Sequence, residues 1–270
     1  MPVPRSAGGS PSSSRGPTIG RSRCDIGQGD AVLVRSAGRV ALVDTGPLPE
    51  PLGACLDTLG IGRIDLLVLS HFDLDHVGGT EAVIGRVDRA IVGPASDAAD
   101  DRLLADLAAG GAVVERVSRG DSGVLGELRF TVLWPRARLG TVEPGNDASV
   151  ALEFAGAGDC ASGCLGSLFL GDLGEQSQAL MLAAGPVSPV DVVKVSHHGS
   201  ADQLPRLYER ASATVGLIGV GADNDYGHPT DELLDLLAGV GTTVWRTDTD
   251  GLILVSPAAA DEGVRVWSER

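Results

Sequence analysis

The stretch His71-Phe-Asp-Leu-Asp-His76 decides both the fold class and the chemistry expected of this chain. An apolar run at residues 66–69 precedes it, and Gly78 and Gly79 follow it. Two imidazoles and two carboxylates therefore stand directly after a predicted buried strand. Each of these groups needs a partner there, because an unpaired buried ionisable group is strongly destabilising. A divalent metal ion, or a pair of ions, supplies such a partner.

The spacing of this motif gives a geometric prediction. If residues 71–75 are extended, the side chains of His71, Asp73 and Asp75 point to one face. His76 then turns inward where the glycines allow the backbone to bend. The alternative is a polar loop between a strand and a helix, with solvated side chains. Clustered His and Asp at ligand spacing favour the metal site.

Length and composition fit one large domain with a sizeable core. The chain has 270 residues, of which 43% are hydrophobic and only 3% aromatic, so Val, Leu, Ile and Ala must build the interior. Its 38 glycines indicate many turns, which favours an α/β or α+β enzyme over a helical bundle. No apolar stretch approaches the ~20 residues of a membrane helix. We therefore expect a soluble chain without a membrane segment.

The charge balance limits the kind of partner. Net charge is −15, from 36 acidic and 21 basic residues. A broad electrostatic grip on nucleic acid normally requires a basic face, so this composition argues against one. It remains compatible with a phosphodiester held at a metal site, where the ions supply the positive charge.

The spacing of the four cysteines does not indicate a disulfide pairing. Cys160 and Cys164 bracket a predicted hairpin loop and could pair or bind a metal, but two thiols make an incomplete zinc site. We therefore expect Cys24, Cys55, Cys160 and Cys164 to be free thiols, and infer no redox compartment from them.

The ends of the chain differ in character. Residues 1–22 are rich in Ser, Gly, Pro and Arg and lack an apolar segment, which predicts a disordered tail and not a signal peptide. Residues 23–270 form the predicted hydrolase domain. The abrupt start of the folded part near Cys24 also fits a fragment of a longer protein.

The hydrophobic pattern predicts short strands alternating with helices. Strands are expected at 31–34, 40–43, 64–69, 90–92, 112–117, 128–133, 149–154, 165–170, 190–195, 214–219, 242–245, 252–255 and 264–267. Helices are expected at 50–59, after Thr80 as N-cap, and at 97–108, 175–182, 204–210 and 231–238. The economical architecture is α+β: two sheets face to face with helices outside, a four-layer αββα sandwich.

Polar residues follow several of these apolar strands, where catalytic groups usually lie. Asp44 and Asp172 each end a predicted strand, and Asp172 is the natural single carboxylate to bridge two ions. His197 and His198 end another strand, and adjacent side chains on an extended backbone face opposite ways. At most one of the pair is then a metal ligand. His228 lies before Pro229, where it either caps a helix or faces substrate.

All five histidines of the chain fall in these places, which favours a functional cluster over scattered structural histidines. The polar motifs follow one another in a fixed order: Asp25-x-Gly-Gln-Gly-Asp30, Asp44-Thr-Gly46, His71-x-Asp-x-Asp-His76, Asn146-x-x-Ser149, Gly171-Asp172, Lys194-x-x-His-His-Gly-Ser200 and Gly227-His-Pro229.

This ordered set resembles the metallo-β-lactamase superfamily. Within it, the set is similar to the soluble C-terminal domain of the DNA-uptake channel protein of natural competence, the ComEC family. The match runs from about Cys24 to the end of the chain. The resemblance implies the αββα fold, a metal-dependent hydrolase, and a role in degrading one strand of incoming DNA.

The resemblance also implies a ligand set. His71 and Asp73 would hold a first metal ion. A second ion would be held by Asp75, His76 and one of His197 or His198, with Asp172 between the two ions.

The sequence differs from the general superfamily pattern at two positions of the first metal site. Asp73 stands where most superfamily members have a second histidine, and Asn146 lies near the expected third histidine. Both changes are usual for the competence branch. The expected cofactors are two divalent ions, Mn²⁺ or Zn²⁺ with Mg²⁺ as an alternative, and the oxygen ligands favour Mn²⁺ or Mg²⁺.

In the expected mechanism, two ions activate water for attack on a phosphate ester, and Asp75 also orients that water. Lys194 and His228 are expected to contact non-bridging phosphate oxygens or assist the leaving group. Asp30 and Asp44 are expected to hold a ligand histidine or close the floor of the site.

The expected substrate is DNA in single-stranded form, and a membrane DNA-uptake channel is the expected partner. One alternative is a stand-alone small-molecule hydrolase, such as a lactonase, thioesterase or small phosphodiesterase. The other is a non-catalytic domain of an uptake complex. The chain would be cytoplasmic if it stands alone, and at the outer face of the cell membrane if it belongs to a channel. The sequence does not predict the oligomeric state.

Overall fold

The strands with apolar residues on both faces form the centres of two packed sheets. A computed structural model describes residues 6–7, 19–160, 163–258 and 263–270. In β5 (Ile64–Leu69), Leu66 and Val68 face the core between the sheets, whereas Leu67 and Leu69 face the helix side. A strand covered on both faces reads as a continuous hydrophobic run, and the sequence shows such a run here.

Nine strands form the first sheet, in the order β1-β16-β15-β2-β3-β4-β5-β6-β7. Their bounds are β1 Ser6–Ala7, β16 Val264–Ser268, β15 Ile253–Pro257, β2 Ile19–Arg23, β3 Val32–Ser36, β4 Arg39–Val43, β5, β6 Val87–Val92 and β7 Val113–Arg116. Seven strands form the second sheet, in the order β14-β13-β12-β11-β10-β9-β8. Their bounds are β14 Thr243–Arg246, β13 Val215–Ile218, β12 Val192–Lys194, β11 Ser167–Phe169, β10 Ala151–Gly156, β9 Leu128–Trp134 and β8 Ser122–Leu125.

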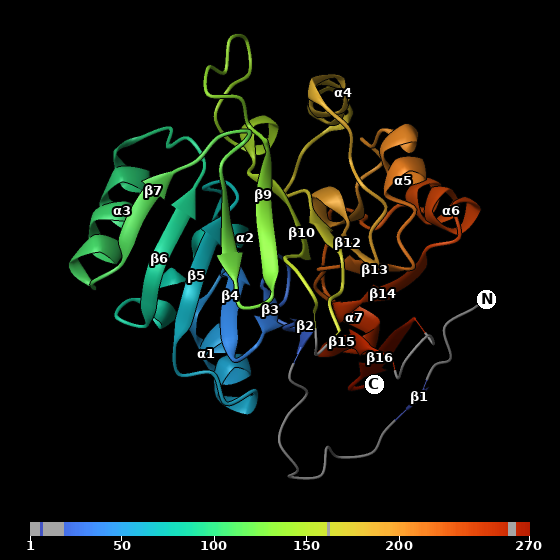
Figure 1. The fold of residues 1–270 in the computed structure, drawn as a ribbon, viewed down its shortest axis with the longest axis horizontal. Coiled ribbons are helices and arrows are strands. Elements are labelled where there is room, and N and C mark those ends of the chain that lie inside the picture. The colour runs from blue at the N-terminus through green and yellow to red at the C-terminus, as the bar shows by residue number, and fades with distance from the viewer. Residues whose placement is uncertain (1–5, 8–18, 161–162, 259–262) are drawn as a thin grey trace.

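Helices cover the outer faces. The α-helices are α1 Pro49–Thr58, α2 Leu74–Val77, α3 Ala98–Ala109, α4 Glu175–Ala184, α5 Pro205–Ala211, α6 Asp231–Gly239 and α7 Thr247–Asp250. Short 3-10 turns are η1 Thr80–Val83, η2 Asn146–Ala148 and η3 Ser196–Gly199. Figure 1 shows α3 beside β6 and β7 at the left, α4 at the top, and α5 and α6 at the right.

Separate hydrophobic clusters define the four layers. Leu52 of α1 and Leu107 of α3 pack on the outer face of the first sheet. Met181 of α4, Leu207 of α5 and Leu233 of α6 pack on the outer face of the second. Between the sheets, β3, β4, β5, β9, β10 and β11 share one core. This arrangement confirms the predicted αββα sandwich of the α+β class.

The parallel strands bring their following loops to one edge. Strands β4 and β5 are parallel neighbours in the first sheet, and β11, β12 and β13 are parallel neighbours in the second. Because parallel strands end at the same side of a sheet, the loops after them meet. Asp44, His71, Asp172 and the pair 197–198 all follow such strands.

Three local expectations need correction. Thr80 does not cap a helix, because it lies inside η1 and its hydroxyl donates to the Val77 carbonyl. The first sheet gains β2, which starts at Ile19, and the second sheet gains β8; the hydrophobic pattern did not reveal either strand. The rest of the expected 1–22 tail lies outside the described residues, apart from Ser6–Ala7 in β1.

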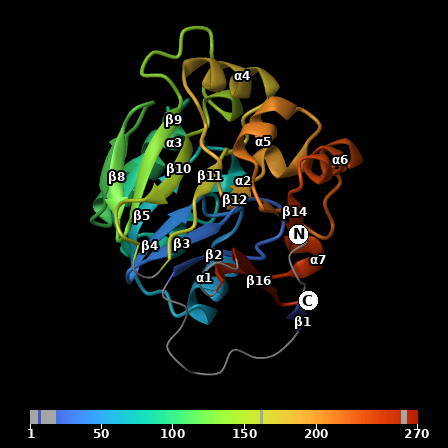
Figure 2. The same cartoon turned by 45° about the vertical axis from the view of Figure 1, so that its right-hand side comes forward.

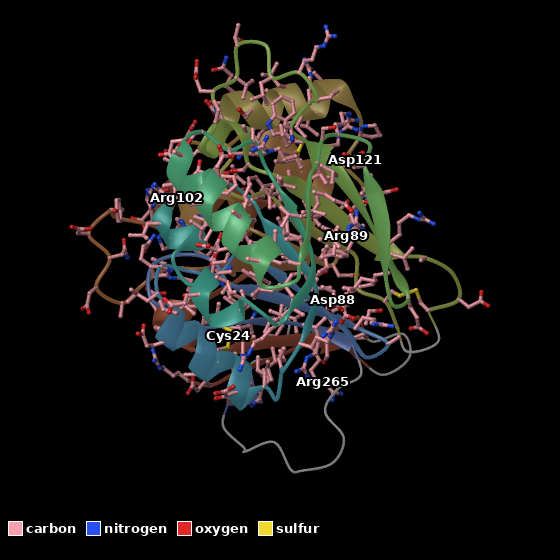
Figure 3. All side chains as sticks on the ribbon, turned by 90° about the vertical axis from the view of Figure 1, so that its left-hand side faces the viewer. Cys24, Asp88, Arg89, Arg102, Asp121 and Arg265 are labelled. Carbon is pink, nitrogen blue, oxygen red and sulfur yellow. A yellow bond between two sulfur atoms is a disulfide. The ribbon has the colours of Figure 1, made fainter. Side chains whose placement is uncertain are left out.

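The expectation of free cysteines is wrong. Cys24 at the end of β2 pairs with Cys55 of α1, with Cα atoms 5.9 Å apart, and Cys160 pairs with Cys164 at 5.5 Å. Figure 3 labels Cys24 beside α1. The first pair lies 31 residues apart in sequence, so tertiary structure, which spacing does not reveal, brings it together. Among the described residues, no helix has the length and hydrophobicity needed to cross a bilayer.

The Cys24–Cys55 bond is expected to carry a large share of stability. Closing a loop of this length in the unfolded chain is worth about 3–4 kcal/mol, against about 2 kcal/mol for the short Cys160–Cys164 loop. The double variant C24S/C55S should therefore lose about 3–4 kcal/mol of unfolding free energy, measured by urea denaturation. C160S/C164S is the matched control with the smaller loss. Equal losses in the two variants would contradict this ordering.

Candidate metal centre

Residues 74–77 are helical, and this changes the geometry expected for the opening motif. Asp73 lies just before α2 with an extended backbone, and Asp75 and His76 lie within the helix. The premise of an extended strand through residue 75 is therefore wrong. Figure 2 shows α2 close to β12, and a contact of Asp75 with the residues after β12 confirms this proximity. The helix delivers Asp75 and His76 to the second sheet and leaves Asp73 near His71.

Four of the expected ligands converge at the edge where the sheets meet. The Nε2 atoms of His76 and His198 each lie 3.2 Å from Oδ2 of Asp172. His198 Nε2 is also 3.0 Å from Oδ2 of Asp75. The four side chains offer ligand atoms that all lie within 4.8 Å of one another. We call Asp75, His76, Asp172 and His198 the four-ligand cluster.

The charges of this cluster are strongly coupled. Burial opposes protonation of His76, but the carboxylates of Asp172 and Asp44 outweigh burial and raise the pKa of His76 well above its usual value. Burial likewise opposes protonation of His198, yet Asp172 and Asp30 raise its pKa to about 9. Burial favours the neutral form of Asp172, but the two imidazoles and Lys194 lower its pKa well below the usual value. The metal-free cluster therefore holds protons where a cation fits.

A second observation indicates a cation beside His71. Its imidazole is 1% exposed, and among the described residues its Nε2 has no hydrogen-bond partner. The nearest carboxylate oxygen is Oδ2 of Asp73 at 3.6 Å. The pKa of Asp73 is lowered, chiefly by its interaction with His71. A buried imidazole nitrogen without a partner is costly, and a metal ion would satisfy it. His71 and Asp73 therefore fit a first site next to the four-ligand cluster.

The other nitrogens of the ligand histidines are fixed by acceptors. His76 Nδ1 donates to Oδ2 of Asp44 over 2.9 Å, and His198 Nδ1 donates to the Gly219 carbonyl over 2.8 Å. Asp44 is itself held by the backbone N–H and hydroxyl of Ser70. With Nδ1 protonated, each ring directs the lone pair of Nε2 toward the cluster, as in metal sites generally.

Asp172 depends on a tight turn. Its backbone N–H donates to the Ser149 hydroxyl over 3.1 Å. The preceding Gly171 has φ +53°, and a Cβ there would lie 2.6 Å from Cβ of Ser149. Only glycine allows this left-handed, crowded backbone without displacement. The Gly171-Asp172 and Asn146-x-x-Ser149 motifs thus form one structural unit that positions the Asp172 carboxylate, a candidate ligand.

Lys194 and Asp30 lie beneath the cluster and not in the cleft. Lys194 is 2% exposed, donates to the Gly171 carbonyl over 2.9 Å, and reaches Oδ1 of Asp172 at 3.4 Å. It also contacts Asp30, which in turn pairs with the buried Arg23. The expectation that Lys194 touches substrate phosphate does not fit this placement. Burial alone would raise the pKa of the Asp30 carboxyl, but the positive charges of Lys194 and Arg23 outweigh burial and hold this pKa below its usual value.

Arg23 is a residue of the site that sequence reasoning missed. It is fully buried and donates to the Gly29 carbonyl and to Asp30. A Cβ on Gly219 would lie 1.2 Å from its Nη2, so a glycine is needed there. A second buried group has possible ligand atoms within 4.8 Å of one another, and it consists of Asp30, Asp44 and His76. However, the cations on Asp30 and the Ser70 bonds of Asp44 already satisfy those carboxylates.

The cleft above the cluster has a volume of about 390 Å³. Of the expected site residues, those that line it are Asp73, Asp75, Asp172, His197, His198 and His228. Gln28, Leu74, Asn146 and Tyr226 line it as well, and the sequence had assigned none of Gln28, Leu74 or Tyr226. A larger hollow of about 600 Å³ lies between α4 and α5, without the carboxylates and imidazoles of the cluster.

His197 and His198 separate because of an unusual backbone. Both have φ +50°, as non-glycine residues in the left-handed region, so they are not extended as expected. His198 enters the cluster, whereas the His197 ring turns toward His228, with centroids 5.7 Å apart. Burial lowers the pKa of both His197 and His228. These two imidazoles are therefore neutral at pH 7 and line the wall of the cleft.

The geometry agrees with the comparison to protein families. The model of the Metallo-beta-lactamase superfamily matches residues 24–206. The chain belongs to the metallo-β-lactamase superfamily. Its fold is shared with the metallo-β-lactamase fold protein YhfI from Bacillus subtilis, at a TM-score of 0.57 and 14% identity, covering 86% of this chain and 98% of that one. CmlA, a diiron β-hydroxylase from Streptomyces venezuelae, has a TM-score of 0.55 at 17% identity, covering 86% and 53%.

Two curated proteins are similar to this chain in sequence. ComE operon protein 3 of Bacillus subtilis (strain 168) is 31% identical over 255 residues, covering 85% of this chain and 32% of the relative. Competence protein ComA of Neisseria gonorrhoeae is 29% identical over 235 residues, covering 85% and 31%. The chain thus spans about a third of the length of these relatives. The expected resemblance to the competence branch is confirmed.

Asp44 should control metal affinity without being a ligand. D44N keeps the shape of the side chain, and Asn tolerates the left-handed backbone of residue 44, where φ is +59°. It removes the negative charge that orients and polarises His76. We expect Mn²⁺ affinity to fall about 10- to 100-fold, measured by calorimetric titration, with an unchanged circular dichroism spectrum. Wild-type affinity in D44N would show that the Asp44–His76 bond is not needed.

The raised pKa of His198 gives a prediction for the metal-free protein. A group whose pKa rises on folding stabilises the protein fully below its unfolded value and loses this effect as pH rises through its folded value. For His198 that loss falls between about 6.5, the usual value, and about 9. In EDTA, wild type should lose unfolding free energy relative to H198N between about pH 6.5 and pH 9. The unfolding free energies of wild type and H198N are measured by urea denaturation at each pH. A constant difference between the two proteins across this pH range would contradict the prediction.

Proposed function

We propose that this chain is a metal-dependent phosphodiesterase that cleaves single-stranded DNA during DNA uptake. The four-ligand cluster at the floor of an open cleft carries the proposal, because it gathers two imidazole nitrogens and two carboxylates from three separate segments of the chain. The similarity to Competence protein ComA and to ComE operon protein 3 supports the setting. Because the chain carries a net charge of −15, we assign attraction of the phosphate to bound cations and not to a basic surface.

The ligand set suits two divalent ions. His71 and Asp73 would hold one ion, and Asp75, His76 and His198 the other, with Asp172 shared. When bound, such ions supply Lewis acidity toward a phosphoryl oxygen and lower the pKa of water. The carboxylate of Asp73 in the first site favours Mn²⁺ or Mg²⁺ over Zn²⁺.

The chain's own groups position the reacting partners. Asp75 has a lowered pKa, because His198 and His76 outweigh its burial, so it is an ionised carboxylate at the cleft wall. It can accept a hydrogen bond from the attacking water and so orient it. His228 and His197 are neutral at pH 7, and each can donate a hydrogen bond to a phosphate or leaving-group oxygen without adding charge. Lys194 and Arg23 act only through Asp30 and Asp172.

The two disulfides bear on where this reaction takes place. Structural disulfides form and persist in oxidising compartments and are rare in the cytosol. The Cys24–Cys55 and Cys160–Cys164 bonds therefore support the outer face of the cell membrane over the cytoplasm. That location fits work beside a DNA-uptake channel, which is the proposed partner.

A small-molecule hydrolase is the second candidate, because the cleft volume of about 390 Å³ fits a ligand of a few hundred daltons. Incubation with single-stranded DNA, a cyclic dinucleotide and an acyl thioester, each with Mn²⁺ or Zn²⁺, separates the two functions. A non-catalytic binding module would cleave none of them. Metal analysis by mass spectrometry then distinguishes a decayed site, which would hold well below one ion per chain.

Removal of the shared carboxylate should abolish activity while preserving the fold. D172A is expected to lower Mn²⁺-dependent cleavage of single-stranded DNA by at least about 100-fold, measured as release of labelled fragments. D235A is the matched control, since Asp235 is an exposed carboxylate on the outer helix α6. Full activity in D172A, with wild-type metal content, would refute the assigned centre.

A further inference from the structure

Tyr226 is an aromatic side chain left in solvent in a chain that has few of them. The sequence contains four Phe, three Trp and two Tyr. Among the described residues, Tyr226, with 70% exposure, is the one aromatic in the exposed class. The others are buried or half-buried. Tyr226 also lines the cleft above the four-ligand cluster, so its exposed ring is placed to contact a ligand bound there.

Tyr226 is connected to the metal centre by a series of rings. It stacks on His228 with centroids 6.2 Å apart and an interplanar angle of 28°. The His228 ring contacts the His197 ring, and the centroids of His197 and His198 lie 6.3 Å apart. The outer ring of the series is thus a flat, exposed face, and the inner ring belongs to the four-ligand cluster. A ligand that fits both ends carries a planar group and a group bound by metal.

The loop that carries Tyr226 is held in place before any ligand arrives. Asn224 donates to the carbonyls of Gly221 and His228 and accepts from the backbone N–H of His228. Beyond it, the N–H of Thr230 donates to the Gly199 carbonyl, next to His198. The loop is therefore tied both to itself and to η3. A platform fixed in this way binds with little loss of conformational freedom.

The cleft has a second apolar residue near its mouth. Leu74, 71% exposed on α2, lines the same cleft as Tyr226. The floor between them is made of carboxylates and imidazoles. Apolar groups over a metal-binding floor suit a ligand with a flat apolar ring joined to an anion. A nucleotide has this combination, whereas a simple aliphatic lactone has neither the flat aromatic ring nor the anion.

We propose that Tyr226, backed by His228, is the stacking platform for an unpaired nucleobase beside the phosphate held at the metal centre. This inference rests on the proposed function of the cleft and names the feature of the substrate that it recognises. Bases in a duplex present only their edges, so only a single strand or a frayed end offers a face. Stacking accepts any base, which predicts cleavage without strong sequence preference.

The test compares two substrates of equal charge. One is a labelled dT oligomer, and the other is an oligomer of the same length in which every base is replaced by an abasic tetrahydrofuran. Mn²⁺-dependent cleavage of both is measured for wild type, Y226A and Y226F. Y226A should lower kcat/KM on the dT oligomer about ten-fold and leave the abasic oligomer unchanged. Y226F keeps the ring and should behave as wild type.

V124A is the matched control, since Val124 is an exposed apolar residue, 60% exposed on β8, outside the cleft. Equal loss on both substrates in Y226A would mean that Tyr226 only supports the loop, and no loss on either would remove any role in recognition. Either result overturns the inference.

A binding measurement keeps the inference testable if wild type cleaves neither oligomer, which would refute the proposed function alone. Anisotropy of the labelled dT oligomer with Ca²⁺ then reports the platform directly. About ten-fold weaker binding by Y226A than by Y226F supports stacking, whereas equal binding overturns it.

Discussion

The cleft depends on the cost of burying carboxylates. Asp30, Asp44 and Asp172 are each at most 3% exposed, and an ionised carboxylate in the interior must be paired. Arg23 and Lys194 supply fixed cations on the inner side, and Ser70 supplies donors to Asp44. On the cleft side, the counterions that the described residues offer to Asp172 are the protonated imidazoles of His76 and His198. A divalent ion would replace those protons, so metal binding and proton release must be linked.

The sequence predicted those features of the fold and the site that depend on residues close together in the chain. The apolar run of β5 and the His-x-Asp-x-Asp-His motif after it predicted both a buried strand and a ligand cluster, since the residue types and their order suffice. It was uninformative where a contact spans the chain. Arg23 resembles a solvated strand residue, and only its proximity to Asp30 and to Gly219, nearly two hundred residues later, makes it part of the site. Lys194 resembles a phosphate-binding lysine until the fold places Asp30 and Asp172 around its ammonium group.

The same limit explains the cysteines and the helix α2. Cys24 and Cys55 come within bonding distance only because β2 ends against α1, which no spacing rule predicts. Their bond has a structural consequence for the site, because Cys24 is adjacent to Arg23 and five residues before Gly29. The loop from Cys24 to Gly29 packs so closely on α2 that a Cβ on Gly29 would lie 2.2 Å from the Asp75 carbonyl oxygen. The disulfide therefore anchors the segment that packs beneath Asp75 and His76, two of the candidate metal ligands.

Asp44, His197 and His198 share a left-handed backbone with φ between 50° and 59°. A side chain in that conformation costs roughly 1–2 kcal/mol, so the fold gives up free energy at the three positions that orient or supply imidazoles. Glycine at any of them would relieve the tension and remove a functional group at the same time. Substitutions chosen only for thermal stability would therefore replace these three residues and remove their side chains. A variant that keeps all three side chains also keeps their backbone strain, which limits how stable it can become.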